Sequence, residues 1–217
     1  MNVLAVDTAG PVAGVALWSG DDVRVRTERV VRGSERRLVP WIAELLDEAG
    51  LTAPMLDGVA AGAGPGAFTG LRVGLATAAG LAQAVGCALW TTSSLRIRAL
   101  AVPHGPAPVL AMLDARKGRV YAGRWHGEES VGAEADVAPE VALGWVDGAF
   151  RATGEGALVY AAEVVAAGGV LVDEAADPGV AVLARLGIVA VAAGKGRDPA
   201  EVRPNYLRAP DAVPRKR

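Results

Sequence analysis

The chain is poor in the residues on which disulfide scaffolds and metal sites depend. Its 217 residues include one cysteine and two histidines. A single cysteine, Cys87, excludes a disulfide within the chain, and its apolar surroundings favour a small buried side chain. His104 and His126 lie far apart, and neither has the spacing of metal ligands. We therefore expect no structural zinc and no other metal site.

The chain also lacks a strong charge of either sign. Lysine and arginine number 22 against 24 aspartate and glutamate residues, which gives a formal net charge of −2. This balance provides no global attraction to nucleic acid or to an anionic membrane. The basic tail at 214–217 is expected to be solvated, and contact with nucleic acid is the alternative. The start at Met1 carries no basic region or cleavage pattern of a signal peptide, so we expect a cytoplasmic protein.

Small residues dominate the segment 62–90, around which the rest of the chain is organised. It begins as a glycine-rich turn and predicts a helix over 67–85. One face of that helix carries a small residue at every fourth position, namely Gly66, Gly70, Gly74, Ala78 and Ala82. Each interior glycine costs roughly 1 kcal/mol of helix propensity relative to alanine. The pattern therefore predicts close approach by another backbone.

Two other interpretations of this segment are weaker. A membrane span has suitable length and small-residue spacing, but Thr69, Arg72 and Gln83 argue against it. A phosphate-binding turn fits a glycine-rich helix start, but no Lys-Ser or Lys-Thr pair follows Gly70, and the glycine spacing does not match a dinucleotide fingerprint. The remaining helix positions are apolar, so we expect burial against a core on one side and against a partner element or chain on another.

Periodicity predicts an α/β lobe on each side of a linker. The expected strands of the first lobe are 2–7, 12–18, 23–28, 57–61 and 89–92, with helices over 34–50 and from Ser93 or Ser94 to 102. Breakers fill the linker 103–108. Strand 109–113, turn 114–118 and strand 119–125 resemble the opening hairpin, which suggests an internal duplication. Beyond them we expect an irregular stretch over 126–150, helices over 158–167 and 180–193, and a loop over 194–204. The predicted units are 1–102, 109–204 and a final segment, 205–217.

Five short motifs occur in an order that resembles one protein family. They are Asp-Thr after the first strand, SERRLVP at 34–40, GPGAFTGLRVG at 64–74, DARKGRVYAG at 114–123 and RPNYLR at 203–208. The chain is similar in these motifs to the TsaB (YeaZ) family over 3–208, and 64–74 is the most specific segment. The resemblance implies an α/β fold of the actin/Hsp70/sugar-kinase (ASKHA) type, with two duplicated lobes of mixed sheet and flanking helices.

The resemblance implies a supporting role in tRNA N6-threonylcarbamoyladenosine modification. On this resemblance, the chain binds the transferase TsaD and joins the ATPase TsaE in a larger complex. It is linked to tRNA only through these partners, and it forms a homodimer when it is alone. The resemblance implies no cofactor for this chain, with ATP or ADP at an interface of the complex. TsaD-like enzymes hold a metal with a histidine pair on a first-lobe helix, and no histidine precedes His104 here. An ATP-using or peptidase-like enzyme of the same fold is the alternative.

The sequence departs from the family pattern at two positions. Ala9 stands where many relatives have a serine, and Gly33 stands where many have a histidine.

The resemblance places the partner contact on the two first-lobe helices. The expected interface residues share a small or apolar surface with basic groups at its rim: Arg37, Leu38, Trp41, Leu45, Gly70, Gly74 and Ala78. An intramolecular core for the whole set is the alternative. On the interface interpretation, Gly74→Leu abolishes dimerisation and leaves the monomer folded.

Candidate phosphate or nucleotide contacts are Asp7 and Arg72. An aspartate at this point of the fold can hold magnesium near phosphates, and capping of the turn at 8–10 is the alternative. Gly154-Glu155-Gly156 could approach a nucleoside, although a glycine-containing turn explains it as well. The hairpin residues Asp114, Arg116 and Lys117 could meet anions, and a solvated hairpin tip is the alternative.

Overall fold

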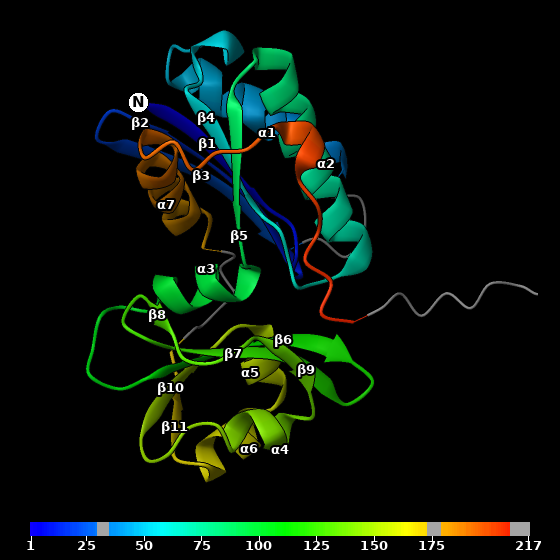
Figure 1. Ribbon diagram of the computed structural model, residues 1–217, viewed down its shortest axis with the longest axis vertical. Helices are drawn as coiled ribbons and strands as arrows, with labels where there is room; N and C mark the ends of the chain where they lie inside the picture. The colour runs from blue at the N-terminus through cyan, green and yellow to red at the C-terminus, as the bar shows by residue number, and fades with distance from the viewer. Residues whose placement is uncertain (30–34, 173–178, 209–217) are drawn as a thin grey trace, which may run out of the picture.

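The computed structural model describes residues 1–29, 35–172 and 179–208. It contains two mixed sheets, one above the other, with a short helix between them (Figure 1). Gly33, Ser34 and the tail 214–217, which the sequence analysis singled out, lie outside the described residues. In the described part of the chain, no helix is both long enough and apolar enough to cross a membrane.

The first sheet begins with an antiparallel meander and continues with two parallel strands. Its order is β3-β2-β1-β4-β5, and the strands are β1 (Asn2–Asp7), β2 (Val12–Ser19), β3 (Asp22–Arg29), β4 (Gly58–Gly62) and β5 (Ala88–Thr92). β4 runs parallel to β1, and β5 runs parallel to β4. The predicted meander is confirmed. Alternation of valine with arginine along β3 fits its place as an edge strand that is largely exposed.

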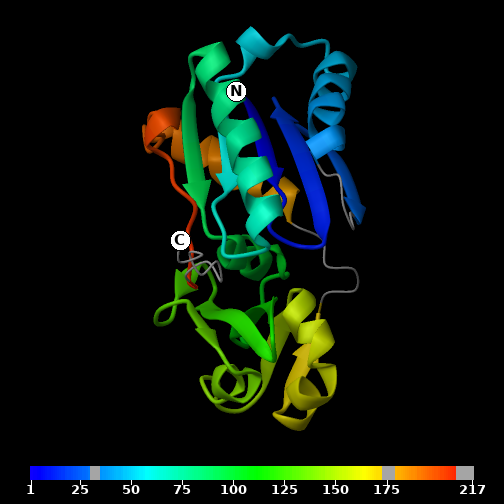
Figure 2. The same ribbon diagram turned by 90° about the vertical axis from the view of Figure 1, so that its right-hand side faces the viewer.

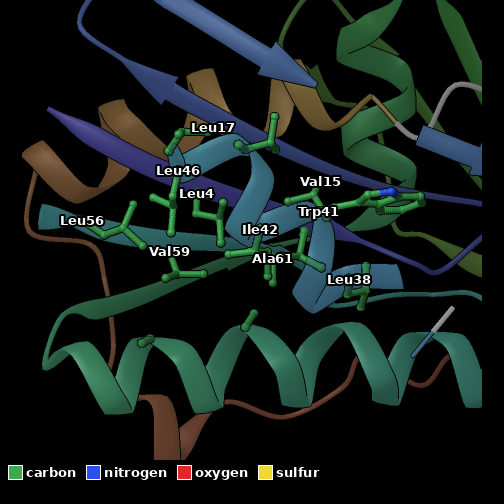
Figure 3. Close-up of a cluster of buried hydrophobic side chains, with 14 of the residues drawn as sticks. Leu4, Val15, Leu17, Leu38, Trp41, Ile42, Leu46, Leu56, Val59 and Ala61 are labelled. Atoms are coloured by element: carbon green, nitrogen blue, oxygen red, sulfur yellow. The ribbon is translucent and has the colours of Figure 1, made fainter. Parts of the chain in front are cut away.

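Helices α1 (Glu35–Glu48) and α2 (Phe68–Val85) lie side by side on one face of this sheet (Figure 2). Between α1 and the sheet, Leu38, Trp41 and Ile42 pack in one cluster with Leu4 and Val59 (Figure 3). The short helix η1 (Ala53–Met55) connects α1 to β4. The predicted amphipathic helix is confirmed, and burial of its apolar stripe is what fixes it to the sheet.

The second sheet repeats the plan of the first. Its order is β11-β10-β6-β7-β8, with β9 also paired to β7. The strands are β6 (Val109–Arg116), β7 (Arg119–His126), β8 (Glu129–Ser130), β9 (Ala135–Val137), β10 (Phe150–Thr153) and β11 (Gly169–Leu171). An antiparallel hairpin is again followed by strands parallel to its first member. The predicted duplication and fold class are confirmed.

The helices of the second lobe are short. They are α4 (Pro139–Leu143), α5 (Glu155–Val159) and α6 (Ala161–Ala166). The prediction of an irregular stretch over 126–150 was wrong, because it contains β8, β9 and α4. The predicted helix over 158–167 is two helices interrupted at Tyr160. Strands of two or three residues are too short to display alternation, which is why the pattern gave no signal.

The helix that follows each sheet along the chain packs on the other sheet. From α3 (Ser94–Ala101), Leu95 and Ala99 pack with Val109 and Trp125 of the second sheet. From α7 (Val180–Ala192), a buried apolar face packs on Val3, Ala5 and Ala60, on the face of the first sheet that α1 and α2 leave open. The predicted unit 109–204 therefore needs correction, since α7 belongs with the first sheet. Apolar periodicity marks a buried face but not the sheet that buries it.

After α7, the chain returns along the first lobe. Arg197 pairs with Leu89 of β5, and the turn η2 (Pro199–Glu201) packs on α2. We call residues 202–208 the strap. Its Asn205 N–H donates to the carbonyl oxygen of Ala63 at 2.6 Å. The expected final element over 205–208 is neither helix nor strand.

Candidate functional site

A buried ion pair joins the end of β1 to α3. Asp7 and Arg98 are 1% and 2% exposed, and Arg98 Nη1 donates to Asp7 Oδ2 at 2.6 Å. The other carboxylate oxygen accepts from the Ala9 N–H at 2.7 Å. Asp7 therefore caps its turn, as the alternative interpretation required. Sequence analysis missed Arg98, whose only signal is a charge inside the apolar run of α3.

Glu155 approaches the same turn from the second lobe. A Cβ on Gly10 would lie 3.1 Å from Arg98 Nη2 and 3.4 Å from Glu155 Oε1. Arg98, which pairs with Asp7, and Glu155 therefore both lie beside Gly10. Burial raises the pKa of Glu155, and the charge of Arg98 offsets this in part. Glu155 Oε2 and Ser94 Oγ are buried without a hydrogen-bond partner among the described residues. We call Asp7, Arg98 and Glu155 the interlobe cluster.

The glycines beside Glu155 have a packing role. Gly154 has a φ of +88°, a conformation that favours glycine. A Cβ on Gly156 would lie 2.9 Å from the backbone of Met112 and Leu113. These glycines let α5 approach β6 closely, which explains them without a nucleoside.

The interlobe cluster does not fit a magnesium–phosphate group in this arrangement. Arg98 neutralises Asp7 at 2.6 Å, so a magnesium ion at that carboxylate would lie beside a guanidinium of the same charge. Across the ranges 1–29, 35–172 and 179–208, no group of three or more histidine, cysteine, aspartate or glutamate residues could hold a metal ion.

The predicted stripe of small residues, which begins just before α2, faces inward. A Cβ on Gly66 would collide with the Ala9 carbonyl, and one on Gly70 or Gly74 would collide with Thr8. Ala78 and Ala82 are fully buried in the first-lobe core. The predicted close approach is present, but the other backbone is the β1–β2 turn of the same chain. The expectation that Gly74→Leu would leave the monomer intact is therefore wrong.

The predicted apolar anchors on α1 are also core residues. Leu38 and Leu45 are fully buried and Trp41 is 4% exposed. Arg37 is exposed, pairs with Glu28 at 3.0 Å and stacks 5.4 Å from the Trp41 ring.

Other residues form the outward face of α1 and α2. They are small or apolar and exposed, as the burial pattern shows for Val39, Ala43, Ala76, Gly80 and Ala84. A Cβ on Gly80 would meet no atom within 4 Å. We call these five residues the α1–α2 face.

Val39 lies on the edge of α1 that faces α2. The opposite edge of α1 carries Arg37 and Glu44, which pair with Glu28 and Arg26 on β3. Residues 37 and 39 are separated by about 200° around a helix, because each residue turns about 100°. Val39, whose side chain is 63% exposed, therefore lies on the outer surface of α1 on the side toward α2.

Arg72 belongs to an exposed group of side chains at the start of α2. Its guanidinium carbon lies 3.7 Å from the centroid of the Phe68 ring, and its Nε donates to Tyr206 Oη at 2.7 Å. The Phe68 and Tyr206 rings stack at 5.6 Å between centroids. We call these three residues the aromatic–arginine cluster. Sequence analysis selected Arg72 alone, because Tyr206 is distant along the chain.

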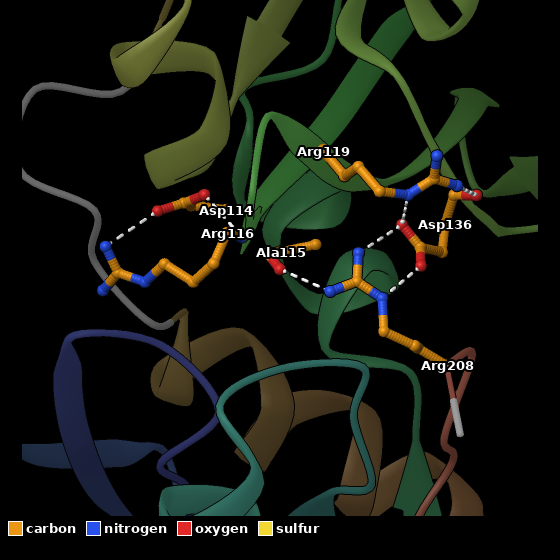
Figure 4. A network of polar contacts seen from close by, with 6 residues as sticks. All are labelled: Asp114, Ala115, Arg116, Arg119, Asp136 and Arg208. Carbon is orange, nitrogen blue, oxygen red and sulfur yellow. Dashed lines mark hydrogen bonds and ion pairs between the residues drawn. The ribbon is translucent and has the colours of Figure 1, made fainter. Parts of the chain in front are cut away.

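The strap also reaches the second lobe (Figure 4). Arg208 donates from Nε to one oxygen of Asp136 at 2.6 Å and from Nη2 to the other at 3.0 Å, and Arg119 shares that carboxylate. Arg208 Nη1 donates to the Ala115 carbonyl at 2.9 Å. At the neighbouring hairpin tip, Arg116 and Lys117 have φ of +60° and +56°. Arg116 pairs with Asp114 at 3.1 Å.

Comparison with known proteins identifies the family. The model for the family described as "TsaD: tRNA N6-adenosine threonylcarbamoyltransferase" matches residues 25–166. A solved structure of YeaZ from Pseudomonas aeruginosa has 31% sequence identity to this chain and a TM-score of 0.83, and the match covers 95% of this chain and 99% of that one. The chain belongs to the TsaB (YeaZ) family.

Two curated relatives agree with this assignment. The Escherichia coli protein named "tRNA threonylcarbamoyladenosine biosynthesis protein TsaB" is 36% identical over 151 residues, which are 65% of this chain and 64% of that protein. The match therefore spans just under two thirds of the E. coli protein. An uncharacterised protein of Mycobacterium tuberculosis is 36% identical over 222 residues, covering 98% of this chain and 94% of that protein.

In this TsaB-family chain, motifs far apart in the sequence meet around the start of α2. Thr8 contacts Gly70 and Gly74, Asn205 contacts Ala63, and Tyr206 contacts Arg72. The most specific motif segment, 64–74, is thus in contact with the motifs at both ends of the chain. Its glycines are explained by this internal packing.

Proposed function

We propose that this chain is a non-catalytic partner subunit in the formation of tRNA N6-threonylcarbamoyladenosine in the cytoplasm. It binds and supports a TsaD-like transferase and joins a TsaE-like ATPase in a larger complex. The observation that carries the proposal is the match to the TsaB (YeaZ) family along nearly the whole chain, at a TM-score of 0.83 to a YeaZ structure. The pathway is that of the E. coli relative, which is named as a tRNA threonylcarbamoyladenosine biosynthesis protein.

Two features support a non-catalytic role. The buried aspartate that could serve nucleotide chemistry, Asp7, is held by Arg98. The only histidines, His104 and His126, do not form the pair on a first-lobe helix that metal binding in TsaD-like enzymes requires. On this proposal the chain needs no cofactor, ATP or ADP binds at an interface of the complex, and a partner subunit makes the main tRNA contacts.

The α1–α2 face is the surface we assign to the TsaD-like partner. Its side chains are small or apolar, and a Cβ on Gly80 would meet no atom within 4 Å. Removal of exposed Val39, Ala43 and Ala76 from water would contribute to association. Arg37 and Glu44, paired with β3, lie at the rim, where charge affects association rate more than affinity. The same face would serve a homodimer of the isolated chain.

Two valines provide a matched test of this surface. Val39 on α1 and Val189 on α7 are each 63% exposed, and they lie on opposite faces of the first sheet. We expect Val39→Arg to abolish binding to the TsaD-like protein of the same organism in calorimetric titration, and Val189→Arg to leave it unchanged. Equal binding by both variants would contradict the assignment of the face.

Two further measurements separate the remaining alternatives. Light scattering of the isolated chain should give a dimer that Val39→Arg converts to a monomer. ATP hydrolysis should be absent from the isolated chain. Turnover of ATP by the purified chain, together with no affinity for the TsaD-like protein, would favour the enzyme alternative.

A further inference from the structure

The aromatic–arginine cluster stands apart from the other aromatic side chains of the protein. Phe68 is 42% exposed and Tyr206 is 38% exposed, and they are the two exposed aromatic residues in the described part of the chain. Their rings stack although they come from α2 and from the strap. The stacked pair forms a small contiguous apolar surface that a ligand or a partner could cover.

Arg72 is the second unusual feature of the cluster. Arg26, Arg37 and Arg119 each pair with a carboxylate. Arg72 has no carboxylate partner among the described residues, and its one hydrogen bond goes from Nε to Tyr206. A guanidinium that stacks on a ring keeps its remaining N–H donors in its own plane. Nη1 and Nη2 are thus available to an acceptor at the edge of the rings.

The strap adds another arginine that no carboxylate compensates. Arg203 is exposed and donates to the carbonyl oxygens of Ala200 and Val202, with no acidic partner in the described ranges. It lies three residues before Tyr206. The strap therefore carries a second exposed arginine besides the guanidinium of Arg72 in the cluster, although the whole chain has a formal net charge of −2.

We propose that the aromatic–arginine cluster binds a single-stranded stretch of RNA directly. A nucleobase stacks on the side of the Tyr206 ring that faces away from Phe68, and a neighbouring phosphate accepts hydrogen bonds from Arg72 Nη1 and Nη2. Aromatic rings beside arginines are the combination by which proteins hold unpaired nucleotides. A carboxylate from a protein partner could pair with Arg72, but it would make no use of the exposed side of the Tyr206 ring.

This inference deepens the proposed function, since an RNA-modifying complex must hold its substrate. It differs from that function in assigning an RNA contact to this chain itself. The cluster lies beside the α1–α2 face, because Arg72 is one helical turn before Ala76. An RNA strand held here would pass along the edge of the partner interface.

Binding of fluorescently labelled oligoadenylate to the isolated full chain tests the inference, measured by anisotropy at several salt concentrations. We expect Arg72→Gln and Tyr206→Leu each to weaken binding about tenfold. Arg72→Gln should also reduce the dependence of log affinity on log salt by about one unit, the signature of one lost phosphate contact. Arg36→Gln, an exposed arginine on α1, is the matched control and should bind as the natural chain does.

Loss of fold is separated from loss of contact by a further variant. Arg72→Lys keeps the positive charge but loses the planar stacking on Phe68, so it should retain the salt dependence and lose affinity. Urea unfolding of each variant checks that the protein remains folded.

Three outcomes would overturn the inference. They are absence of oligoadenylate binding by the natural chain, equal weakening by Arg36→Gln, and unchanged RNA binding by Arg72→Gln. If Arg72→Gln lost binding to the TsaD-like protein but kept RNA binding, the cluster would belong to the protein interface instead. Because RNA binding is measured without that protein, this inference and the proposed function can fail separately.

Discussion

The side chain of Thr8 occupies the space that a Cβ on Gly74 would need. Its Oγ1 also donates a hydrogen bond to the carbonyl oxygen of Gly70 at 2.6 Å, one turn earlier in α2. The turn after β1 is thereby fixed to the helix through both glycines. This contact explains why α2 accepts glycines that lower its intrinsic helix propensity.

Two glycines of the same helix should respond to alanine with opposite signs. Gly74→Ala forces Thr8 out of its place, and we expect a loss of about 1–3 kcal/mol in the free energy of unfolding. Gly80→Ala meets open space, and we expect a gain of roughly 0.5–1 kcal/mol from helix propensity. Urea denaturation of both variants checks this. Similar shifts for the two would show that the inward stripe is not tightly packed.

The ion pair between Asp7 and Arg98 should show strong coupling. Arg98→Met leaves a buried carboxylate without its cation, and we expect it to cost about 3–5 kcal/mol. Asp7→Leu should be similarly severe, and the double variant should cost far less than the sum of the two. A double-mutant cycle by urea denaturation measures this. Additive losses would mean that the two side chains do not stabilise each other.

Glu155 should make the protein less stable as pH rises. Burial raises its pKa in the folded state, so the folded chain holds this proton more tightly than the unfolded chain does. Its contribution is fully present below the pKa of the unfolded chain, about 4.3, and is lost as pH rises through the folded-state pKa. Glu155→Gln should remove this slope in urea denaturation across a pH series. Parallel curves for the two proteins would contradict the assignment.

Asp136 should give the opposite slope. Burial alone would raise its pKa, but hydrogen bonds and charge from Arg208 and Arg119 together hold it below the ordinary value. Its contribution is present above the pKa of the unfolded chain, about 3.9, and is lost as pH falls through the lowered folded-state pKa. Asp136→Asn should flatten the acid limb of the stability curve. An unchanged acid limb would show that the strap is not held by this carboxylate.

The elements of the first lobe follow from patterns within single segments. Leu38, Trp41 and Leu45 repeat at helical spacing, and valines alternate with arginines along β3, so both elements were predicted. The same patterns could not show whether a given side of a buried helix packs within its own chain or against a partner. The stripe of Gly70 and Gly74 was therefore assigned to a partner, although Thr8 already covers it.

Contacts between residues far apart in the chain could not be predicted from the sequence. Arg98 is 91 residues from Asp7, and Tyr206 is 134 residues from Arg72. No periodicity links such pairs, because each depends on how the two lobes and the strap come together. The resemblance to a family supplied the fold class and the proposed function, while the interlobe cluster and the aromatic–arginine cluster came from the structure.

The packing of α7 on the first sheet also sets the order in which the fold can be completed during synthesis. Val3, Ala5 and Ala60 are synthesised well before the helix that covers them, Val180–Ala192. Until then one face of the first sheet remains open to water, where transiently exposed apolar surface favours aggregation. The burial of this face therefore has to wait for the synthesis of α7.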